Sequence, residues 1–262
     1  MSLPVIEVEH LHYRVGDVVI LAEISFVVSE GEYVSIIGPN GAVKTTLLKC
    51  INRLINPTSG AIRVYGRPVG SYRRAELATL IGYVPQADGR IFPFTVYEIV
   101  MMGRYPHLSP FASPRPSDVE AVHRALALTE TEQFADRFHA TLSGGEKQKV
   151  MIAAALAQEA RILLLDEPTT FLDPKHQTEI FRILRKVNEE AGVTILSVTH
   201  DINTATLSST RIIALKQGRC VFSGSPREVM TQEVLGQLYE KQFLFVSHPV
   251  TGERLVVPEG RT

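Results

Sequence analysis

The sequence predicts an α/β fold with a parallel β-sheet core, preceded by antiparallel β-structure and interrupted by a block of helices. Continuous apolar runs at residues 33–37, 161–165 and 193–198 have the length and composition of strands that are buried on both faces. A helical segment over residues 177–190 separates the last two runs, which is typical of a parallel strand–helix–strand unit. Between about residues 87 and 160 the apolar side chains instead recur with helical spacing.

The composition is that of a globular protein of 262 residues, enough for one large domain or for a core domain with an insert. Lys and Arg number 27 against 28 Asp and Glu, and the net charge of −1 argues against a surface built to bind nucleic acid. The longest apolar run, residues 150–157, is much shorter than the roughly 20 residues of a membrane-spanning helix. Cys50 and Cys220 are far apart in the sequence, and we expect both to be reduced thiols of a cytosolic protein.

Antiparallel strands are expected in the first thirty residues. Residues 5–13 roughly alternate between apolar and polar side chains, and the apolar stretches 18–21 and 24–28 follow a hairpin-type turn at Gly16-Asp17. The buried strand at residues 33–37 comes next.

The helical block is expected to contain helices over residues 95–102, 118–128 and 147–157, together with a proline-rich loop. Near the C-terminus, residues 211–215 predict a strand that returns through a turn at Gln217-Gly218. A helix is expected to start after Ser225, since proline follows at its first position and Glu228 completes a capping box. We therefore divide the chain into a core of residues 1–86 and 161–224, a helical insert of residues 87–160, and a C-terminal helix and tail of residues 225–262.

Residues 38–45 join the strand at residues 33–37 to a helix over residues 44–53, which is the place of a phosphate-binding loop. Such a loop turns backbone N–H groups toward a phosphate at the helix N-terminus, where the helix dipole favours negative charge. Lys44 would add a positive charge at the β- and γ-phosphate oxygens, and the Thr45 hydroxyl would ligate Mg²⁺. Taken alone, the segment is also compatible with a strand-to-helix turn that binds nothing. The residues expected to contact the nucleotide here are Gly38, Pro39, Asn40, Gly41, Ala42, Val43, Lys44, Thr45 and Thr46.

Val43 departs from the phosphate-loop pattern G-x-x-x-x-G-K-[ST], which has glycine at this position. A β-branched side chain is poorly suited to positive φ or to a close backbone approach. If the position needs either, the strain of about 1–3 kcal/mol would lower nucleotide affinity roughly 5- to 150-fold. Whether Val43 weakens nucleotide binding or abolishes it stays open.

Two carboxylates follow a buried strand at residues 162–167. In open α/β sheets ligands bind at the carboxyl edge of the strands, so Asp166 is placed to hold Mg²⁺ through water and Glu167 to polarise an attacking water. A strand followed by an acidic turn is the alternative for this segment alone.

The segment Leu142-Ser-Gly-Gly-Glu carries a second signal. Ser143 and Glu146 form a capping box that opens the helix running to residue 157. Gly144 and Gly145 weaken the first helical turn by about 1 kcal/mol each, and bare backbone donors at a helix N-terminus can approach a phosphate closely. A well-capped helix without a ligand is the alternative.

Three further polar or aromatic residues indicate a function only through their order in the chain relative to these motifs. Gln86 follows a strand at residues 81–84, His200 follows the strand at 193–198, and Tyr13 lies in the first predicted strand. A single Gln or His at a strand end usually has its hydrogen bonds satisfied locally, and a single Tyr more often belongs to the core or its rim.

Taken in order, these motifs resemble those of an ATP-binding cassette, a P-loop NTPase with a RecA-like core, an N-terminal antiparallel β-subdomain and an inserted α-helical subdomain. Residues 38–45 resemble its Walker A loop, residues 142–146 its signature and residues 162–167 its Walker B motif. The resemblance covers about residues 5–224.

The single residues fit the same family. Gln86 resembles the Q-loop glutamine, Asp173 the D-loop aspartate and His200 the switch histidine, and Tyr13 lies where the family stacks an aromatic ring on adenine. Phe171, in the D-loop, stands where the family usually has a small residue.

The resemblance implies an ATPase that uses ATP and Mg²⁺ and works as a dimer. Each of two ATP molecules would lie between the Walker A loop of one copy and Ser143, Gly144 and Gly145 of the other, near Asp173. The Mg²⁺ ion would be held by Thr45, Gln86 and Asp166. The residues implied in catalysis are Glu167, His200, Lys44 and Gln86.

A narrower similarity is to the ATPase subunits of importers for iron siderophores, haem and vitamin B12. It lies in residues 73–78 and 95–108, in Glu146 of the signature and in the closing segment 248–258. It implies permease subunits as partners, contacted near residues 103–117, an indirect substrate-binding protein, no nucleic acid, and a peripheral place on the cytoplasmic side of the cell membrane.

Three hypotheses therefore remain. The first is the ATPase subunit of a metal-chelate importer. The second is a cassette protein without a transporter partner, acting in cluster assembly, translation or DNA repair. The third is a nucleotide-binding module disabled by Val43. The cargo itself cannot be read from this chain.

Overall fold

The structure, a computed structural model, describes residues 3–39, 43–87, 89, 92–109 and 112–257. It contains two compact units, of which the first runs to Gly70 and resumes at Leu196, and the second is Ser71–Ile195. The division falls inside one strand, β8 (Thr194–Val198).

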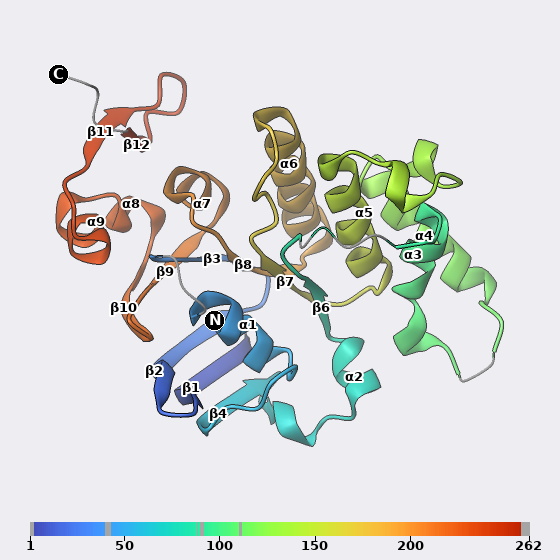
Figure 1. Cartoon of the computed structure of the whole chain (residues 1–262), viewed down its shortest axis with the longest axis horizontal. Coiled ribbons are helices and arrows are strands. Elements are labelled where there is room, and N and C mark those ends of the chain that lie inside the picture. Colours follow the sequence, from blue (N-terminus) through green and yellow to red (C-terminus); the bar gives the residue numbers. More distant parts are fainter. Residues whose placement is uncertain (1–2, 40–42, 88, 90–91, 110–111, 258–262) are drawn as a thin grey trace. The chain divides into compact units, whose positions relative to one another are not determined.

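An antiparallel sheet fills the N-terminal part of the first unit. Its strands pair in the order β2–β1–β4–β5, with bounds Val18–Ser29, Pro4–Val15, Ser59–Val64 and Arg67–Pro68. These strands are drawn in blue to cyan in Figure 1. The hairpin at Gly16-Asp17 is confirmed. The apolar stretches 18–21 and 24–28 both lie in β2, which continues through an irregularity in register between Leu21 and Ile24, where Glu23 has φ 62°.

The rest of the first unit combines parallel strands, antiparallel strand pairs and helices. Strand β3 (Tyr33–Ile37) is fully buried and pairs in parallel with β9 (Arg211–Lys216) on one side, with β8 as its neighbour on the other. Strand β9 returns as β10 (Arg219–Gly224) through the expected turn at Gln217-Gly218. Helix α1 (Val43–Ile51) follows β3. The remaining elements of this unit are α7 (Ile202–Ser208), α8 (Pro226–Val229), α9 (Gln232–Tyr239), β11 (Leu244–Ser247) and β12 (Arg254–Val257).

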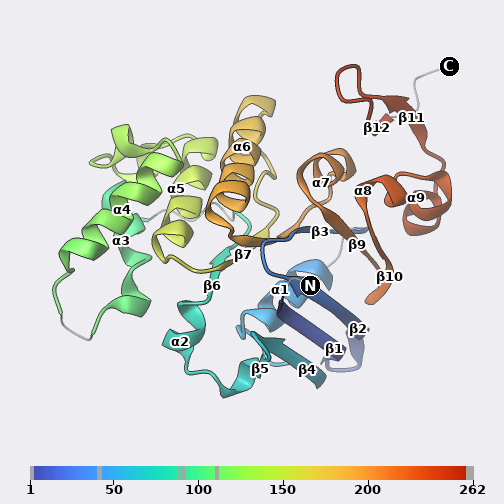
Figure 2. The ribbon, with the colours of Figure 1, turned by 180° about the vertical axis from the view of Figure 1, so that it is seen from behind.

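The second unit joins parallel strands to a group of helices. Strand β6 (Ile81–Val84) pairs in parallel with β7 (Ile162–Asp166), whose other neighbour is β8. Its helices are α2 (Arg74–Ala78), α3 (Val96–Met102), α4 (Pro116–Leu128), α5 (Gly144–Ala157) and α6 (Pro174–Ala191). Helices α3, α4 and α5 lie side by side, as both ribbon views show (Figures 1 and 2). The apolar core that they share includes Val100, Val122 and Val150.

Short 3₁₀ turns complete the description, at Val69–Ser71, Tyr105–His107, Glu132–Phe134 and His139–Thr141. Within the described part of the chain, no helix combines the length and the apolar character needed to span a membrane. Cys50 and Cys220 are both free thiols.

The predicted fold class is confirmed: an antiparallel β-subdomain, parallel strands with helices, and a helical part are all present. The domain boundaries at residues 86, 160 and 224 stay a prediction, since the two compact units are divided at other points of the chain.

Candidate functional site

The predicted site residues fall into one group in each compact unit. Tyr13, the loop from Gly38 to Thr46, and His200 belong to the first unit. Gln86, the signature residues 143–145, the Asp166-Glu167 pair and Asp173 belong to the second.

Gly38 is the first residue after strand β3, and its backbone requires glycine. Its φ is 147°, and a Cβ built there would lie 2.0 Å from the backbone oxygen of Leu215 in β9. Any side chain would therefore push β9 away from the start of the loop. This glycine lets the chain turn closely past the neighbouring strand into helix α1.

Lys44 lies in the first turn of α1 and is almost fully buried, with 3 % of its surface exposed. Its Nζ donates hydrogen bonds to the carbonyl oxygens of Gly38 at 2.9 Å and Pro39 at 3.2 Å. A buried ammonium must be hydrogen-bonded to offset its desolvation. The loop thus holds a cation at the N-terminal end of a helix, the place where a bound phosphate is stabilised.

Val43 is the first residue of α1. Helical backbone has negative φ, so the strain expected from a positive φ does not arise at this residue. The question of close backbone approach to a phosphate is separate and stays a prediction. Asn40, Gly41 and Ala42 lie outside the described residues.

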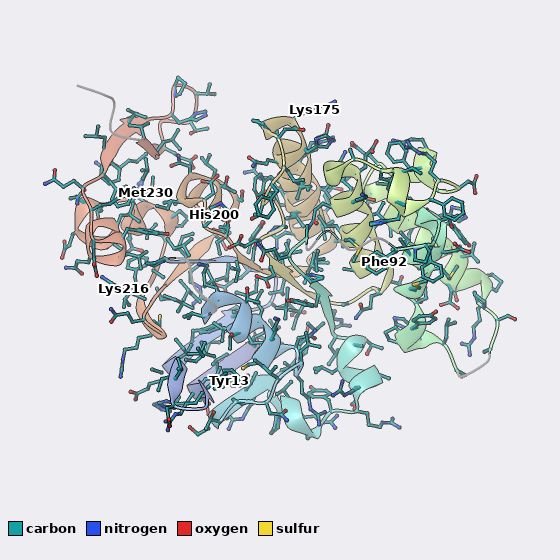
Figure 3. The ribbon with its side chains drawn as sticks, viewed as in Figure 1. Tyr13, Phe92, Lys175, His200, Lys216 and Met230 are labelled. Atoms are coloured by element: carbon teal, nitrogen blue, oxygen red, sulfur yellow. The ribbon has the colours of Figure 1, made fainter. Side chains whose placement is uncertain are left out.

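The other predicted site residues of the first unit, apart from Tyr13, follow strand β3 or strand β8 in the chain. Thr45 is half-buried and Thr46 is buried in α1. Strand β8 ends beside β3, since the N–H of Thr199 donates to the carbonyl of Ile36 at 3.1 Å. His200 follows at once and is exposed (Figure 3). The strand that carries the phosphate-loop candidate and the strand that carries His200 therefore end together at one edge.

Tyr13 lies half-buried near the end of β1, where it pairs with Leu21 of β2 (Figure 3). The structure leaves its expected role at adenine a prediction.

In the second unit, Asp166 is the last residue of the buried strand β7, with 1 % of its surface exposed. Its Oδ2 accepts a hydrogen bond of 3.2 Å from the phenol of Tyr83, which lies in the neighbouring strand β6. Burial and the Asp166 carboxylate both raise the pKa of Tyr83, so its hydroxyl stays protonated and donates. Tyr83 thereby fixes the orientation of the proposed metal ligand.

Glu167 stands just beyond the strand with φ 48°, in the left-handed region that costs a non-glycine residue about 1–3 kcal/mol. Its Oε2 accepts two hydrogen bonds, from Gln86 Nε2 at 3.2 Å and from Thr170 Oγ1 at 2.8 Å. The parallel pairing of β6 and β7 brings Gln86 and Glu167 to the same edge, because Val84 is opposite Leu165. Two residues predicted separately as catalytic are thus in direct contact.

The signature segment forms the predicted helix start. Ser143 is the N-cap of α5: its hydroxyl accepts from the N–H of Glu146 at 3.3 Å, and Glu146 Oε2 accepts from the N–H of Ser143 at 2.7 Å. The bond from the Ser143 backbone lowers the pKa of Glu146. Ser143 and Gly144 are exposed, so this helix end is open to a ligand or a partner.

Asp173 caps helix α6. Its Oδ1 accepts from the N–H of His176 at 3.0 Å, and its Oδ2 lies 2.7 Å from the Nδ1 of the same histidine. Both contacts lower the pKa of Asp173. Phe171, two residues earlier, has φ 65° and is 88 % exposed, which is exceptional for a large apolar side chain.

The residues assigned to the metal carry the oxygen donors that Mg²⁺ prefers: the Asp166 carboxylate, the Thr45 hydroxyl and the Gln86 amide. Within the described ranges, no three or more His, Cys, Asp or Glu side chains gather as an all-protein metal site would require. The donor set fits an ion that takes most of its ligands from water and phosphate.

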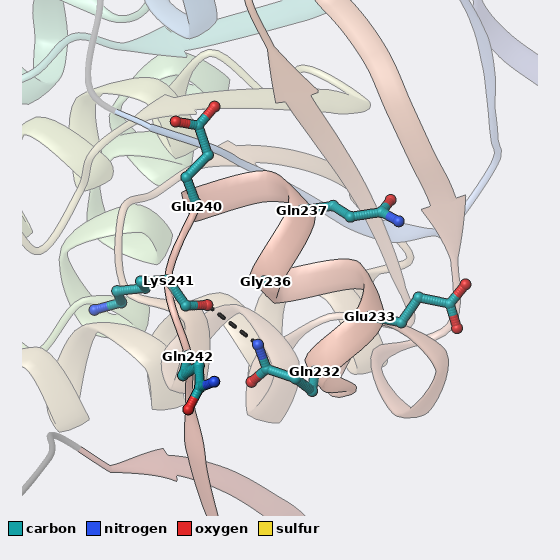
Figure 4. A pocket seen from close by; sticks show the side chains of 7 residues that line it. All are labelled: Gln232, Glu233, Gly236, Gln237, Glu240, Lys241 and Gln242. Atoms are coloured by element: carbon teal, nitrogen blue, oxygen red, sulfur yellow. Dashed lines mark hydrogen bonds between the residues drawn. The ribbon is translucent and has the colours of Figure 1, made fainter.

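A surface depression beside α9 lies apart from every predicted site residue in the sequence. It is lined by α9 and by Glu240–Gln242 (Figure 4). Gln232 is already engaged there, since its Nε2 donates to the carbonyl of Lys241 at 3.2 Å and its Oε1 accepts from the N–H of Phe243 at 2.7 Å. These two bonds join the start of α9 to the segment that follows the helix, and we assign no ligand to the depression.

Sequence reasoning missed Tyr83, Thr170 and His176, which hold Asp166, Glu167 and Asp173 in place. Each lies within ten residues of a predicted site residue or in the next strand. Tyr83 comes to Asp166 through the parallel pairing of β6 with β7, which the motifs alone do not indicate.

Comparison with known proteins shows which family this chain belongs to. The family profile described as "ABC transporter" matches residues 21–170. The ferric enterobactin transport ATP-binding protein FepC of Escherichia coli (strain K12) is 39 % identical over 254 residues, which cover 97 % of this chain and 94 % of that protein. The hemin import ATP-binding protein HmuV of Streptomyces coelicolor is 39 % identical over 248 residues, covering 95 % and 88 %.

Solved structures agree in fold. A chain of a metal-chelate type ABC transporter in an inward-facing conformation has a TM-score of 0.85 and 27 % identity, with 98 % of both chains covered. The ATP-binding cassette MJ0796, in a dimeric post-hydrolysis state bound to ADP and phosphate, has a TM-score of 0.73 and 33 % identity, with 85 % of this chain and 99 % of that chain covered. From the family match, and from relatives well above 30 % identity along nearly its whole length, this chain belongs to the ABC transporter family and is an ATP-binding cassette protein.

Proposed function

We propose that this chain is the ATP-hydrolysing subunit of an importer that takes up a metal chelate: an iron siderophore, haem or cobalamin. The observation that carries the proposal is the similarity, over nearly the full length of both chains, to ATP-binding proteins named for enterobactin transport and hemin import. The proposal gives each site residue a role in ATP binding or hydrolysis.

Nucleotide binding is assigned to the loop and first turn of α1. Backbone N–H groups from Gly38 to Thr46 bind the phosphates, and Lys44 exchanges its bonds to loop carbonyls for bonds to the β- and γ-phosphate oxygens. The support is that Lys44 is buried at the helix N-terminus with its ammonium turned to the loop. Tyr13 stacks on the adenine ring.

Hydrolysis is assigned to the Asp166-Glu167 pair with Gln86 and His200. Mg²⁺ would be held by Thr45, Asp166 and Gln86, and when bound it neutralises charge on the phosphates. Glu167 orients and deprotonates the attacking water, and His200 donates to the γ-phosphate. The buried strand end of Asp166 and the two hydrogen bonds to Glu167 support these assignments.

A second copy of the chain completes each site. Ser143, Gly144 and Gly145 of one copy cover the γ-phosphate bound by the other, with Asp173 beside them, so closure depends on ATP and opening follows hydrolysis. The exposure of Ser143 and Gly144, and the dimeric state of the similar cassette MJ0796, support this role.

Permease subunits and, through them, a substrate-binding protein are the further partners we propose. The chain would then sit at the cytoplasmic face of the cell membrane as a peripheral subunit. Gln86 would report the nucleotide state to the permease, and residues 103–117 would lie near its cytoplasmic helices.

The test is steady-state ATP hydrolysis by the purified chain and by Glu167→Gln, followed by affinity purification from membranes. We expect hydrolysis in the natural chain and its loss in the variant, with ATP-dependent dimers retained and a polytopic membrane protein co-purifying. Unchanged hydrolysis in Glu167→Gln would refute the role of Glu167. Hydrolysis without any membrane partner would favour the cassette protein that acts outside transport.

A further inference from the structure

The signature helix α5 and the helix after the D-loop, α6, approach each other closely at Gly145 and His176. A Cβ built on Gly145, in the first turn of α5, would lie 2.1 Å from Cδ2 and 2.2 Å from Cγ of His176 in α6, and 2.8 Å from its Cβ. Real Cβ atoms do not approach other heavy atoms this closely. The ring of His176 therefore occupies the volume that any other residue at position 145 would need.

The backbone of Gly145 does not itself require glycine. Gly145 lies in the first turn of helix α5, where every residue type adopts the backbone conformation. Its neighbour Gly144 has open surroundings by comparison, since a Cβ there would meet only Leu172 Cδ2, at 3.7 Å. Of these two signature glycines, the second is required by the position of His176.

His176 is held in this position by Asp173. The carboxylate of Asp173 binds both the backbone N–H of His176, at 3.0 Å, and its ring Nδ1, at 2.7 Å. An ionised carboxylate only accepts hydrogen bonds, so Nδ1 carries the proton and donates. The ring cannot turn away from Gly145 without losing this bond.

A second contact fixes the same two helices one turn further on. Lys149 of α5 and Glu179 of α6 form an ion pair at 2.5 Å, and Lys149 is 9 % and Glu179 23 % exposed in their side chains. Gly145 and Lys149 are one turn apart on α5, as His176 and Glu179 are on α6. Together the two contacts fix where the start of α5 lies along its own axis, and how it is rotated about that axis, relative to α6.

We infer that His176 is a positioning residue, which sets the signature segment Ser143–Gly145 relative to the D-loop aspartate Asp173. It acts through Gly145, against which its ring packs, and through Asp173, which its Nδ1 binds. This inference rests on the proposed function, in which both segments face the nucleotide bound by a second copy. A displaced ring would move the signature donors and the D-loop together, and so lower turnover in the closed dimer.

A double-mutant cycle of Gly145→Ala and His176→Ala tests the inference in the full chain. We expect Gly145→Ala alone to lower kcat for ATP about a hundredfold, and to lower it about tenfold or less when His176→Ala is already present. The rescue is incomplete because the Cβ of residue 176 still lies 2.8 Å from the new methyl group. Equal losses in both backgrounds would overturn the inference.

Gly144→Ala is the matched control, since it is the same substitution one residue earlier without the overlap with His176. Its effect on kcat should be the same in the natural chain and in His176→Ala. A second variant, His176→Asn, keeps a donor for Asp173 but removes the ring. It should retain more activity than His176→Ala, but Gly145→Ala should stay harmful in its background, because the asparagine Cγ takes the place of the ring Cγ, which lies 2.2 Å from the new methyl group.

Two further readouts separate positioning from a general loss of stability. ATP affinity of the monomer should stay unchanged in His176→Ala, because Lys44 and its loop belong to the other compact unit. ATP-dependent dimerisation, measured in the Glu167→Gln background, should weaken about tenfold. A lowered melting temperature with unchanged kcat and unchanged dimerisation would mean that His176 only stabilises the fold.

Failure of the proposed function gives a different result. If the natural chain hydrolyses no ATP, or if Glu167→Gln hydrolyses it normally, the proposed function fails before the cycle is measured. If both behave as proposed and the cycle shows no coupling, only the role of His176 is wrong.

Discussion

Gln86 donates a hydrogen bond from Nε2 to Oε2 of Glu167, at 3.2 Å, and so ties the residue after strand β6 to the residue after strand β7. The hydroxyl of Thr170 donates to the same oxygen at 2.8 Å. Both donors are neutral, so they orient the carboxylate without removing its negative charge. Glu167 is therefore held in one orientation, at a backbone conformation that costs free energy, before any nucleotide binds.

Thr170 should affect turnover through Glu167. Thr170→Val keeps the shape of the side chain and removes the donor, so we expect kcat for ATP to fall about tenfold with little change in KM. Thr170→Ser keeps the hydroxyl and should retain most of the activity. Steady-state kinetics decide the matter, and equal kcat values for Thr170→Val and the natural chain would show that the bond is dispensable.

Gly38 should tolerate no side chain. Gly38→Ala combines an unfavourable φ with a Cβ 2.0 Å from the Leu215 oxygen, so it should lower the free energy of unfolding by about 1–3 kcal/mol or more and weaken ATP binding. Gly66→Ala is the matched control, because Gly66 has φ 72° with nothing within 4 Å of the added Cβ. Chemical denaturation of both variants separates the overlap from the backbone strain, and equal losses would show that the overlap is relieved easily.

Val43 should weaken ATP binding by crowding the bound phosphate. We expect Val43→Gly to bind ATP more tightly, because glycine removes the side chain that limits a close approach to the phosphate, and crowding of about 1–3 kcal/mol corresponds to roughly 5- to 150-fold in affinity. Val43→Ala should lie between the two. Titration of ATP against the three chains measures this, and equal affinities would exclude any disabling effect of Val43.

Arg104 should be critical to the stability of the helical part. Its buried guanidinium donates to Asp118 Oδ1 at 3.0 Å, to the carbonyl of Ala157 at 2.6 Å and to Glu159 Oε2 at 2.7 Å. Removing it in Arg104→Met leaves Asp118 buried without its charge partner, which costs about 3–5 kcal/mol. Arg124→Met, which removes an exposed partner of Glu159, should cost less than about 1 kcal/mol. Similar unfolding free energies for the two variants would contradict this account.

Asp118 should contribute to the acid sensitivity of the fold. The bond from the backbone N–H of Arg115, together with Arg104, lowers the pKa of Asp118 below its ordinary value of 3.8. A carboxyl whose pKa is lowered by folding stabilises the fold above that ordinary value, and this contribution is lost as the pH falls through the folded pKa. Unfolding free energy should thus drop below about pH 4.

The matched variant for this effect is Asp118→Asn, which cannot titrate. It should be less stable at neutral pH and should lose less stability than the natural chain as the pH falls from about 6 to below about 4. Parallel pH profiles for the variant and the natural chain would show that Asp118 is not the group responsible.

The sequence predicted those features that depend on local pattern. The buried strands β3, β7 and β8 follow from continuous apolar runs, and the start of α5 follows from the capping box of Ser143. Strand β4 could not be found in this way, because Ile62 and Val64 are too few to make a pattern. It forms by pairing with β1, where Val64 lies opposite Ile6.

The site residues that the sequence missed depend on contacts between segments. Tyr83 reaches Asp166 across 83 positions of the chain, and His176 reaches Gly145 from another helix. A pattern within a short stretch of sequence cannot reveal a contact between segments that lie far apart in the chain. The residues proposed to carry the chemistry could therefore be predicted from motifs, while the residues that orient them required the folded structure.

The central claim is that ATP is hydrolysed only when a second copy covers it with its signature segment. The most direct measurement is the structure of the Glu167→Gln chain with ATP and Mg²⁺, in the dimer that forms in solution. We predict Ser143 and the backbone N–H of Gly145 from one copy within hydrogen-bond distance of the γ-phosphate that Lys44 of the other copy binds. A nucleotide-bound dimer in which residues 143–145 touch no phosphate would contradict the account.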